Sequence, residues 1–260
     1  MENNYWIVDD LLIFKPSFNE ELTNYYEIIN KYKKVIFSNY NDPLIAIKTN
    51  NKFEYEYDDK HIQSDFNKEI YLSNNINLTH LTLGDSFNTE INLSNNINLT
   101  DLTLLHVNKE IDLSNNINLT HLTFRDLFNK EIDLSNNINL THLTFGENFN
   151  QDINISFNVK SLKMFGCNNQ YIIDNLHNNI EELRIYNNNL NLDNLPNSIK
   201  KIYIEEYAAE INNLPNSIEY LELKYYNFKI KKIPKNLKTI KCNKEYKYIN
   251  DFKDYEVIYH

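Results

Sequence analysis

The stretch NKEIDLSNNINLTHLTF occurs twice without a single difference, at residues 108–124 and 129–145. Each copy ends in an apolar triplet with the spacing L-x-x-L-x-L, which reads Leu119, Leu122, Phe124 in the first copy. The last two triplet positions alternate with polar residues, which is the period of a strand. A unit of about 20 residues cannot bury one strand by itself, so successive units are expected to stack.

The triplet recurs along most of the chain at intervals of 19–21 residues. This regular spacing predicts a solenoid in which each unit adds one short strand to a parallel sheet. Tyr32, Val35 and Phe37 resemble an earlier copy, and residues 53–57 suggest a divergent one. The other triplets are Leu78, Leu81, Leu83; Leu99, Leu102, Leu104; Leu140, Leu143, Phe145; Val159, Leu162, Met164; Ile180, Leu183, Ile185; Ile199, Ile202, Ile204; Ile218, Leu221, Leu223; and Leu237, Ile240, Cys242.

The rest of each unit is the return path between strands. Early units use L-S-N-N-I-N-L, and late units use the shorter L-P-N-S-I, whose Pro suits an extended path without ladder hydrogen bonds. No return resembles a long amphipathic helix. A recurring Phe-Asn pair, with Val107-Asn108 as a variant, is followed by Ile three residues after the Asn. The Phe and Ile side chains are expected to face inward: Phe66, Phe87, Phe128, Phe149, Ile70, Ile91, Ile111, Ile132 and Ile153.

The two ends depart from the pattern. Residues 19–33 suggest a short capping helix after Pro16, because a solenoid end otherwise exposes its core. The sequence therefore predicts a divergent N-terminal cap with the first repeats at 1–65, a repeat array at 66–242 and a C-terminal cap at 243–260.

Composition limits the class of function. The net charge of −10 argues against a general nucleic-acid binder, which needs a basic face. From Glu222 to His260 there are ten Lys against five acidic residues, as in a solvated end cap.

Cys167 and Cys242 are too few for a disulfide framework, so free thiols in a reducing compartment are expected. No signal peptide or membrane-length apolar run is visible, which predicts a cytoplasmic protein without membrane contact.

The segments LTHLTFGENFNQDI at 140–153 and LPNSIKKIYI at 195–204 resemble FNIP repeats, a leucine-rich-repeat variant abundant in social amoebae and in giant DNA viruses that infect amoebae. The likeness covers about residues 66–242. It implies a β-rich leucine-rich-repeat solenoid with a curved parallel sheet on its concave side and extended or irregular convex returns. Ordinary leucine-rich repeats carry an Asn ladder, and here the Phe-Asn pair stands nearby instead. The L-P-x-x-L returns also resemble repeats of bacterial effectors.

The search for catalytic chemistry centres on the third position of the motif. No phosphate loop, H-E-x-x-H motif or Cys cluster is present, so no catalytic residue and no cofactor are predicted. Two imidazoles, His121 and His142, on adjacent strands near Asp101 suit a metal ion, whereas a duplicated surface row needs no metal; we expect the latter. The row reads His80, Asp101, His121, His142, Ser161, Glu182, Lys201, Tyr220 and Thr239.

The fifth and seventh positions of the motif point to a binding surface. In early units the fifth position is Thr82, Thr103, Thr123 or Thr144, which suits an exposed strand. Late units form a mixed grid in which Tyr and Arg are typical of interface hot spots, although Glu182 with Lys201 and Glu205 with Lys224 would also suit cross-strand pairs. Besides Glu182, the grid consists of the predicted binding residues Arg184, Tyr186, Lys201, Tyr203, Glu205, Tyr220, Glu222 and Lys224.

These patterns favour a non-enzymatic protein that binds a protein partner through its concave sheet. If the chain is viral, the resemblance implies a host protein as partner. Because some viral FNIP-repeat proteins carry an F-box, the resemblance also leaves open a substrate receptor of a ubiquitin ligase, although no F-box pattern is visible in residues 1–60. An enzyme is the third alternative. The sequence indicates neither the partner's identity nor the oligomeric state.

Overall fold

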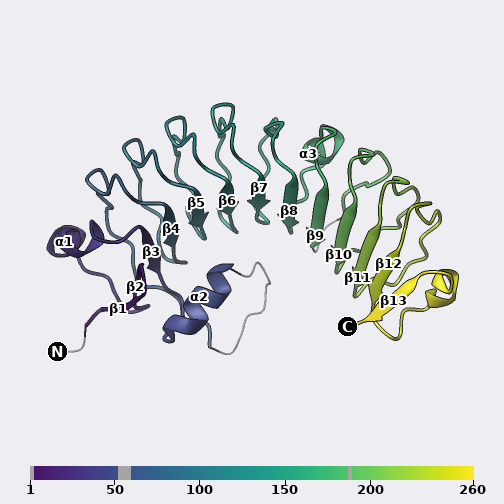
Figure 1. Ribbon diagram of the computed structural model, residues 1–260, viewed down its shortest axis with the longest axis horizontal. Helices are drawn as coiled ribbons and strands as arrows, with labels where there is room; N and C mark the ends of the chain where they lie inside the picture. Colours follow the sequence, from purple (N-terminus) through teal and green to yellow (C-terminus); the bar gives the residue numbers. More distant parts are fainter. Residues whose placement is uncertain (1–2, 52–59, 187–188) are drawn as a thin grey trace. The chain divides into compact units, whose positions relative to one another are not determined.

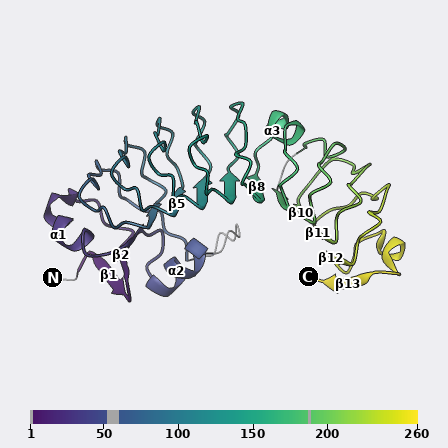
Figure 2. The same ribbon diagram turned by 45° about the horizontal axis from the view of Figure 1, so that its top comes forward.

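The computed structural model describes residues 3–51, 60–186 and 189–260. The chain divides into two compact units, Met1–Leu140 and Thr141–His260. Within each unit the strands lie side by side and the return segments lie on the opposite side, as both ribbon views show (Figures 1 and 2). The predicted fold is confirmed: this is a leucine-rich-repeat-like parallel solenoid. The suggested copy at residues 53–57 lies outside the described residues.

The first unit carries six strands in chain order. β1 and β2 form an antiparallel hairpin, and every later neighbouring pair is parallel. The early copy at Val35 and Phe37 is confirmed, because both side chains are buried in β3. The hairpin was not predicted, because the triplet spacing is lost there. The strands are β1 Tyr5–Val8, β2 Leu11–Phe14, β3 Lys34–Phe37, β4 His80–Leu83, β5 Asp101–Leu104 and β6 His121–Phe124.

Two helical segments accompany these strands. The predicted helix within 19–33 is present in a shorter form, as a 3₁₀ turn at Leu22–Tyr25 followed by α1 at Tyr26–Ile29. The second segment, α2 at Pro43–Asn51, covers the outward face of β2 and β3. Its Ala46 packs with Ile13 and Ile36 in a small apolar cluster, joined by Trp6, Val8, Leu11, Tyr40 and Ile47. The strand face is therefore closed at this end by the chain itself.

The second unit carries seven parallel strands in chain order. One return contains a single helical turn, α3 at Gln170–Asp174, and the C-terminal segment contains a 3₁₀ turn at Ile249–Phe252. The remaining described returns are extended or irregular, as predicted. The strands are β7 His142–Phe145, β8 Ser161–Phe165, β9 Glu182–Tyr186, β10 Lys201–Glu205, β11 Tyr220–Lys224, β12 Thr239–Cys242 and β13 Glu256–Tyr259.

The core of each unit is built from the repeated triplets. Equivalent residues pair in register, for example Leu102 with Leu122 and Ile202 with Leu221, and these side chains are almost fully buried. Alternation along a strand explains this, because every second residue points to the same face. Phe rings of the Phe-Asn pairs extend the core: the Phe37 and Phe66 ring centroids are 4.1 Å apart. The predicted inward Phe and Ile positions are buried, except for the partly exposed Ile132.

A buried Asn ladder holds the early coils together. The Asn116 side-chain amide donates hydrogen bonds to the backbone carbonyls of Leu93 and Asn96, both at 3.0 Å, in the preceding coil. Asn75, Asn96 and Asn137 occupy the equivalent position and make the same pair of contacts. Most of these carbonyls also accept a backbone N–H within their own return, as Leu93 does from Asn96. Each Asn side chain therefore adds hydrogen bonds that join one coil to the next.

The interpretation that the Phe-Asn pair replaces this ladder was therefore wrong. The Phe-Asn asparagines form a separate row at the surface, in which the backbone N–H of Asn88 donates to the Asn67 side chain at 3.0 Å. Asn108 and Asn129 continue the row. The buried ladder uses the second Asn of L-S-N-N-I-N-L, which follows another Asn and repeats in every early unit.

The late coils are joined by other hydrogen bonds. Ser198 and Ser217, in the L-P-N-S-I returns, donate to carbonyls of the preceding coil at 2.7 Å. Tyr207 and Tyr226 are buried where early units have Phe. The Tyr207 hydroxyl donates to the Leu190 carbonyl, and the Tyr226 hydroxyl accepts from the backbone N–H of Ile211 at 3.1 Å. Burial raises the pKa of both tyrosines to about 12.

These two tyrosines predict a loss of stability at alkaline pH. In the unfolded chain they ionise near their ordinary pKa of about 10, whereas in the fold they stay protonated to about 12. Their contribution is therefore complete below pH 10 and is lost as the pH rises from about 10 to 12, by roughly 2–3 kcal/mol per tyrosine. Urea denaturation across this range should show the decline.

The matched variants are Tyr226→Phe and Tyr225→Phe. Tyr225 precedes Tyr226 in the chain, but its side chain is exposed. We expect Tyr226→Phe to flatten the decline and Tyr225→Phe to leave it unchanged. Identical pH profiles for the Tyr226→Phe protein and the parent would contradict the assignment.

Candidate functional site

The predicted binding residues lie together on one face of β9, β10 and β11. Lys201 is in register with Glu182 and Tyr220, Tyr203 with Arg184 and Glu222, and Glu205 with Tyr186 and Lys224. These nine residues are called the β9–β11 grid below. Since parallel strands lie about 4.8 Å apart, side chains in the same register position are neighbours across the sheet.

The centre of the grid is an aromatic and cationic cluster. The Arg184 guanidinium lies over the Tyr203 ring, 4.1 Å from its centroid. The Tyr203 and Tyr220 rings follow at 5.4 Å between centroids. The Tyr220 hydroxyl donates to the Glu222 carboxylate at 2.8 Å. Burial is the main cause that raises the pKa of Tyr203 and of Tyr220, so both remain neutral donors at physiological pH.

One edge of the grid is neutralised internally. Lys224 and Glu205 form an ion pair at 2.6 Å, and Lys241 on β12 lies 3.3 Å from Glu222. The His260 Nε2 is 3.7 Å from Glu222, and desolvation lowers the His260 pKa, which favours the neutral imidazole. The prediction of a Glu205–Lys224 pair is confirmed. Lys241 and His260 were missed, although Lys241 occupies the same fifth position one unit later.

The other predicted pair, Glu182 with Lys201, is in register but not joined. Glu182 instead accepts a hydrogen bond from Ser161 of β8 at 3.4 Å, and within the described residues no ion pair links it to Lys201. Register brings two side chains to neighbouring strands, but it does not select which acceptor or donor each side chain reaches.

The early threonines are not an exposed row. Thr82, Thr123 and Thr144 are buried, and only Thr103 is partly exposed. The expectation of an exposed Thr surface was therefore wrong at three of four positions. The early strands offer a partner little of this row to contact.

Two histidines of the predicted row, His80 and His121, pair with Asp101 in the first unit. His80 Nε2 lies 3.3 Å from one Asp101 oxygen, and His121 Nδ1 lies 3.5 Å from the other. Desolvation is the largest cause of a lowered His80 pKa. His142 belongs to the second unit. Among the described residues, no group of three or more His, Cys, Asp and Glu side chains is arranged to hold a metal ion.

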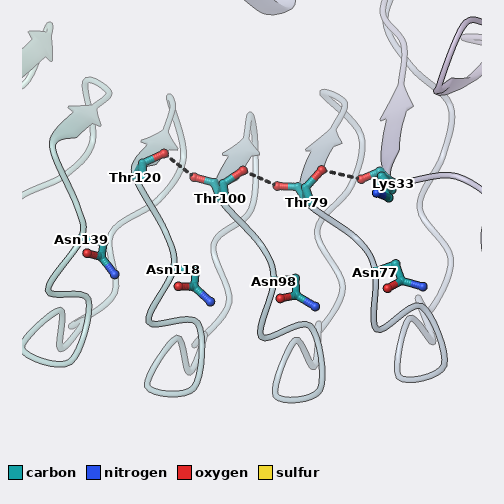
Figure 3. A pocket seen from close by; sticks show the side chains of 8 residues that line it. All are labelled: Lys33, Asn77, Thr79, Asn98, Thr100, Asn118, Thr120 and Asn139. Atoms are coloured by element: carbon teal, nitrogen blue, oxygen red, sulfur yellow. Dashed lines mark hydrogen bonds between the residues drawn. The ribbon is translucent and has the colours of Figure 1, made fainter.

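A shallow groove of about 670 Å³ lies along the edge of the first unit where strands begin (Figure 3). Its side chains connect coils: Thr100 Oγ1 donates to the Thr79 carbonyl at 3.0 Å, and Asn98 donates to the Ile76 carbonyl at 2.9 Å. The repeated N-L-T triplets are thus used to stack coils. The lining is Lys33, Asn77, Thr79, Asn98, Thr100, Asn118, Thr120 and Asn139.

Residues 186–226 match the family model described as FNIP Repeat. This segment is an FNIP repeat. The matched FNIP segment includes Tyr203 and Tyr220 of the β9–β11 grid and the Pro196 and Pro215 returns between its strands. FNIP repeats thus supply the most varied part of the strand face.

One solved structure shows the same fold. The chain is similar to CroV588, a giant-virus protein described as a novel circular leucine-rich-repeat structure, with 22% identity, a TM-score of 0.61 and 94% of this chain covered. The chain spans 38% of that protein's length. It also matches the functional domain of InlJ from Listeria monocytogenes at 15% identity and a TM-score of 0.41, over 68% of this chain and 51% of that one. No curated protein matches.

The two cysteine thiols lie in the core. Cys167 and Cys242 are buried and unpaired, and burial raises the pKa of Cys167 to about 11. Such a thiol is a poor nucleophile at neutral pH, because the thiolate is the reactive form. Among the described residues, no helix combines the length and apolar character needed to span a bilayer.

Proposed function

We propose that this FNIP-repeat chain is a non-enzymatic protein that binds a protein partner through the β9–β11 grid. The observation that carries the proposal is the Arg184–Tyr203–Tyr220 cluster on a sheet whose strands are fixed in register. Aromatic and Arg side chains are enriched at interface hot spots. Because the sheet fixes their backbone, little ordering is needed on binding.

The rest of the strand face is less suited to a partner. α2 covers β2 and β3 through Ala46, and three of the four early threonines are buried. The grid, by contrast, presents aromatic, cationic and anionic groups that differ from strand to strand. A surface with varied groups can discriminate between partners, whereas a uniform row repeats one weak contact.

The test is a comparison of captured proteins between the parent and a Tyr203→Ala, Tyr220→Ala double variant. Tyr71→Ala is the matched control, because Tyr71 is an exposed tyrosine of the first unit. We expect the relevant partner to be retained by the parent and the control, and lost by the double variant. A protein retained by all three would not bind through the grid.

The captured partner then allows a quantitative prediction. Tyr203→Ala and Tyr220→Ala should each raise Kd at least about fivefold, since truncation at a hot spot costs roughly 1–4 kcal/mol. Thr103→Ala, at the partly exposed early threonine, should change Kd less than about twofold. A titration in which Thr103→Ala weakens binding as much as the tyrosine changes would place the partner on the early strands.

A further inference from the structure

The two units differ in net charge. Thr141–His260 contains fifteen Lys and Arg against fifteen Asp and Glu, so it is neutral, and the whole net charge of −10 lies in Met1–Leu140. An acidic partner is therefore repelled by the first unit and not by the second. Within the β9–β11 grid, Lys224 has a carboxylate partner, which leaves the cations Arg184 and Lys201.

Arg184 is held in place but is not neutralised. Its guanidinium is stacked on Tyr203 at 4.1 Å, which fixes its plane. Its Nε atom is buried and has no hydrogen-bond partner. Within the described part of the chain, no ion pair is formed by this side chain. A guanidinium presents five N–H donors in a rigid fork that fits a carboxylate, so Arg184 has unused donors in a fixed orientation.

Lys201 is the second available cation. Its side chain is exposed, and among residues 3–51, 60–186 and 189–260 it makes no ion pair. It lies one strand from Arg184 and two residues away in register, because Lys201 is paired with Glu182 and Tyr203 with Arg184. Diagonal neighbours of this kind are about 7–8 Å apart, within reach of long side chains. One carboxylate between them can contact both.

We infer that Arg184 and Lys201 bind the carboxylate of an acidic segment of a protein partner, while Tyr203 and Tyr220 pack against the side chains beside that carboxylate. The inference rests on the proposed function and adds the chemistry of the partner. A carboxylate held by charge-assisted hydrogen bonds binds more strongly than its amide analogue. The neutral second unit lets this local attraction act, because no excess of acidic residues opposes it.

The experiment follows the arginine Nε–H signals by NMR in the full chain. The sequence has only two arginines, Arg125 and Arg184, so Arg125 is an internal control in every spectrum. The probes are acetyl-Phe-Glu-Phe-amide and its matched analogue acetyl-Phe-Gln-Phe-amide. We expect the Glu peptide to shift the Arg184 signal with a Kd about tenfold lower than that of the Gln peptide, and to leave Arg125 unmoved.

Two lysine variants sharpen the test. Lys201→Gln should raise the Kd of the Glu peptide at least about fivefold. Lys200→Gln should leave it unchanged, because the neighbouring Lys200 pairs with Glu181 at 3.6 Å and is not part of the grid. Rescue of binding by Lys201→Arg would show that the charge, and not the shape of the side chain, is required.

Three outcomes overturn the inference. Equal shifts by the Glu and Gln peptides remove the carboxylate site but leave the grid as a binding face. Tighter binding of inorganic phosphate than of the Glu peptide assigns Arg184 and Lys201 to a phosphate-bearing ligand. No shift from either peptide on β9, β10 or β11 counts against both the carboxylate site and the proposed function.

Discussion

Replacement of Leu122 by aspartate is expected to abolish most of the folded population of the protein. Leu122 is 1% exposed and pairs in register with Leu102 of the neighbouring strand. The substitution removes a buried leucine, which costs roughly 2–5 kcal/mol, and it adds a buried charge without a partner. Because native domains are stable by only about 5–15 kcal/mol, the sum is a large part of the total.

Far-ultraviolet circular dichroism and urea denaturation measure this effect. Leu127→Asp is the matched control, because Leu127 is 42% exposed and lies outside the strand. We expect the control to unfold within about 1 kcal/mol of the parent. If Leu122→Asp unfolded at the same urea concentration as the parent, the side chain would not face the core.

The second large effect is expected at Asn116. Asn116→Ala removes two donors and leaves the buried carbonyls of Leu93 and Asn96 without their side-chain hydrogen bonds. Each carbonyl keeps one backbone hydrogen bond, from the N–H of Asn96 to Leu93 and from the N–H of Leu99 to Asn96. The loss of two side-chain hydrogen bonds, at about 0.5–1.5 kcal/mol each, should therefore lower the free energy of unfolding by roughly 1–3 kcal/mol. Asn116→Asp should cost more, because a carboxylate there faces two carbonyl oxygens.

Asn115→Ala is the control that distinguishes the ladder from general loss of an asparagine. Asn115 precedes Asn116, is exposed, and donates one long hydrogen bond to the Ser94 carbonyl at 3.3 Å. We expect a loss of less than about 1 kcal/mol. Equal losses at the two positions, measured by urea denaturation, would mean that the buried ladder does not stabilise the stack.

The strand positions were determined by sequence alone. The L-x-x-L-x-L spacing placed Leu122 and Leu221 inward and Tyr203 and Lys201 outward, and the registers agree. This information is local, because alternation along a strand and a fixed repeat length define both the face and the neighbour of each residue. The same strand alternation and repeat length predicted that the residues of the β9–β11 grid lie next to one another.

Several features were decided only by the tertiary structure. Asn115 and Asn116 are the same residue type side by side, and the path of the return determines which one is buried. α2 closes the face of β2 and β3 through contacts between residues distant in sequence. Glu182 accepts a hydrogen bond from Ser161 and forms no ion pair with Lys201 among the described residues. Which of the two partners Glu182 contacts depends on how far each side chain reaches across the strands. Repeat spacing fixes backbone neighbours, whereas burial and pairing of side chains depend on how the stacked coils fill space in three dimensions.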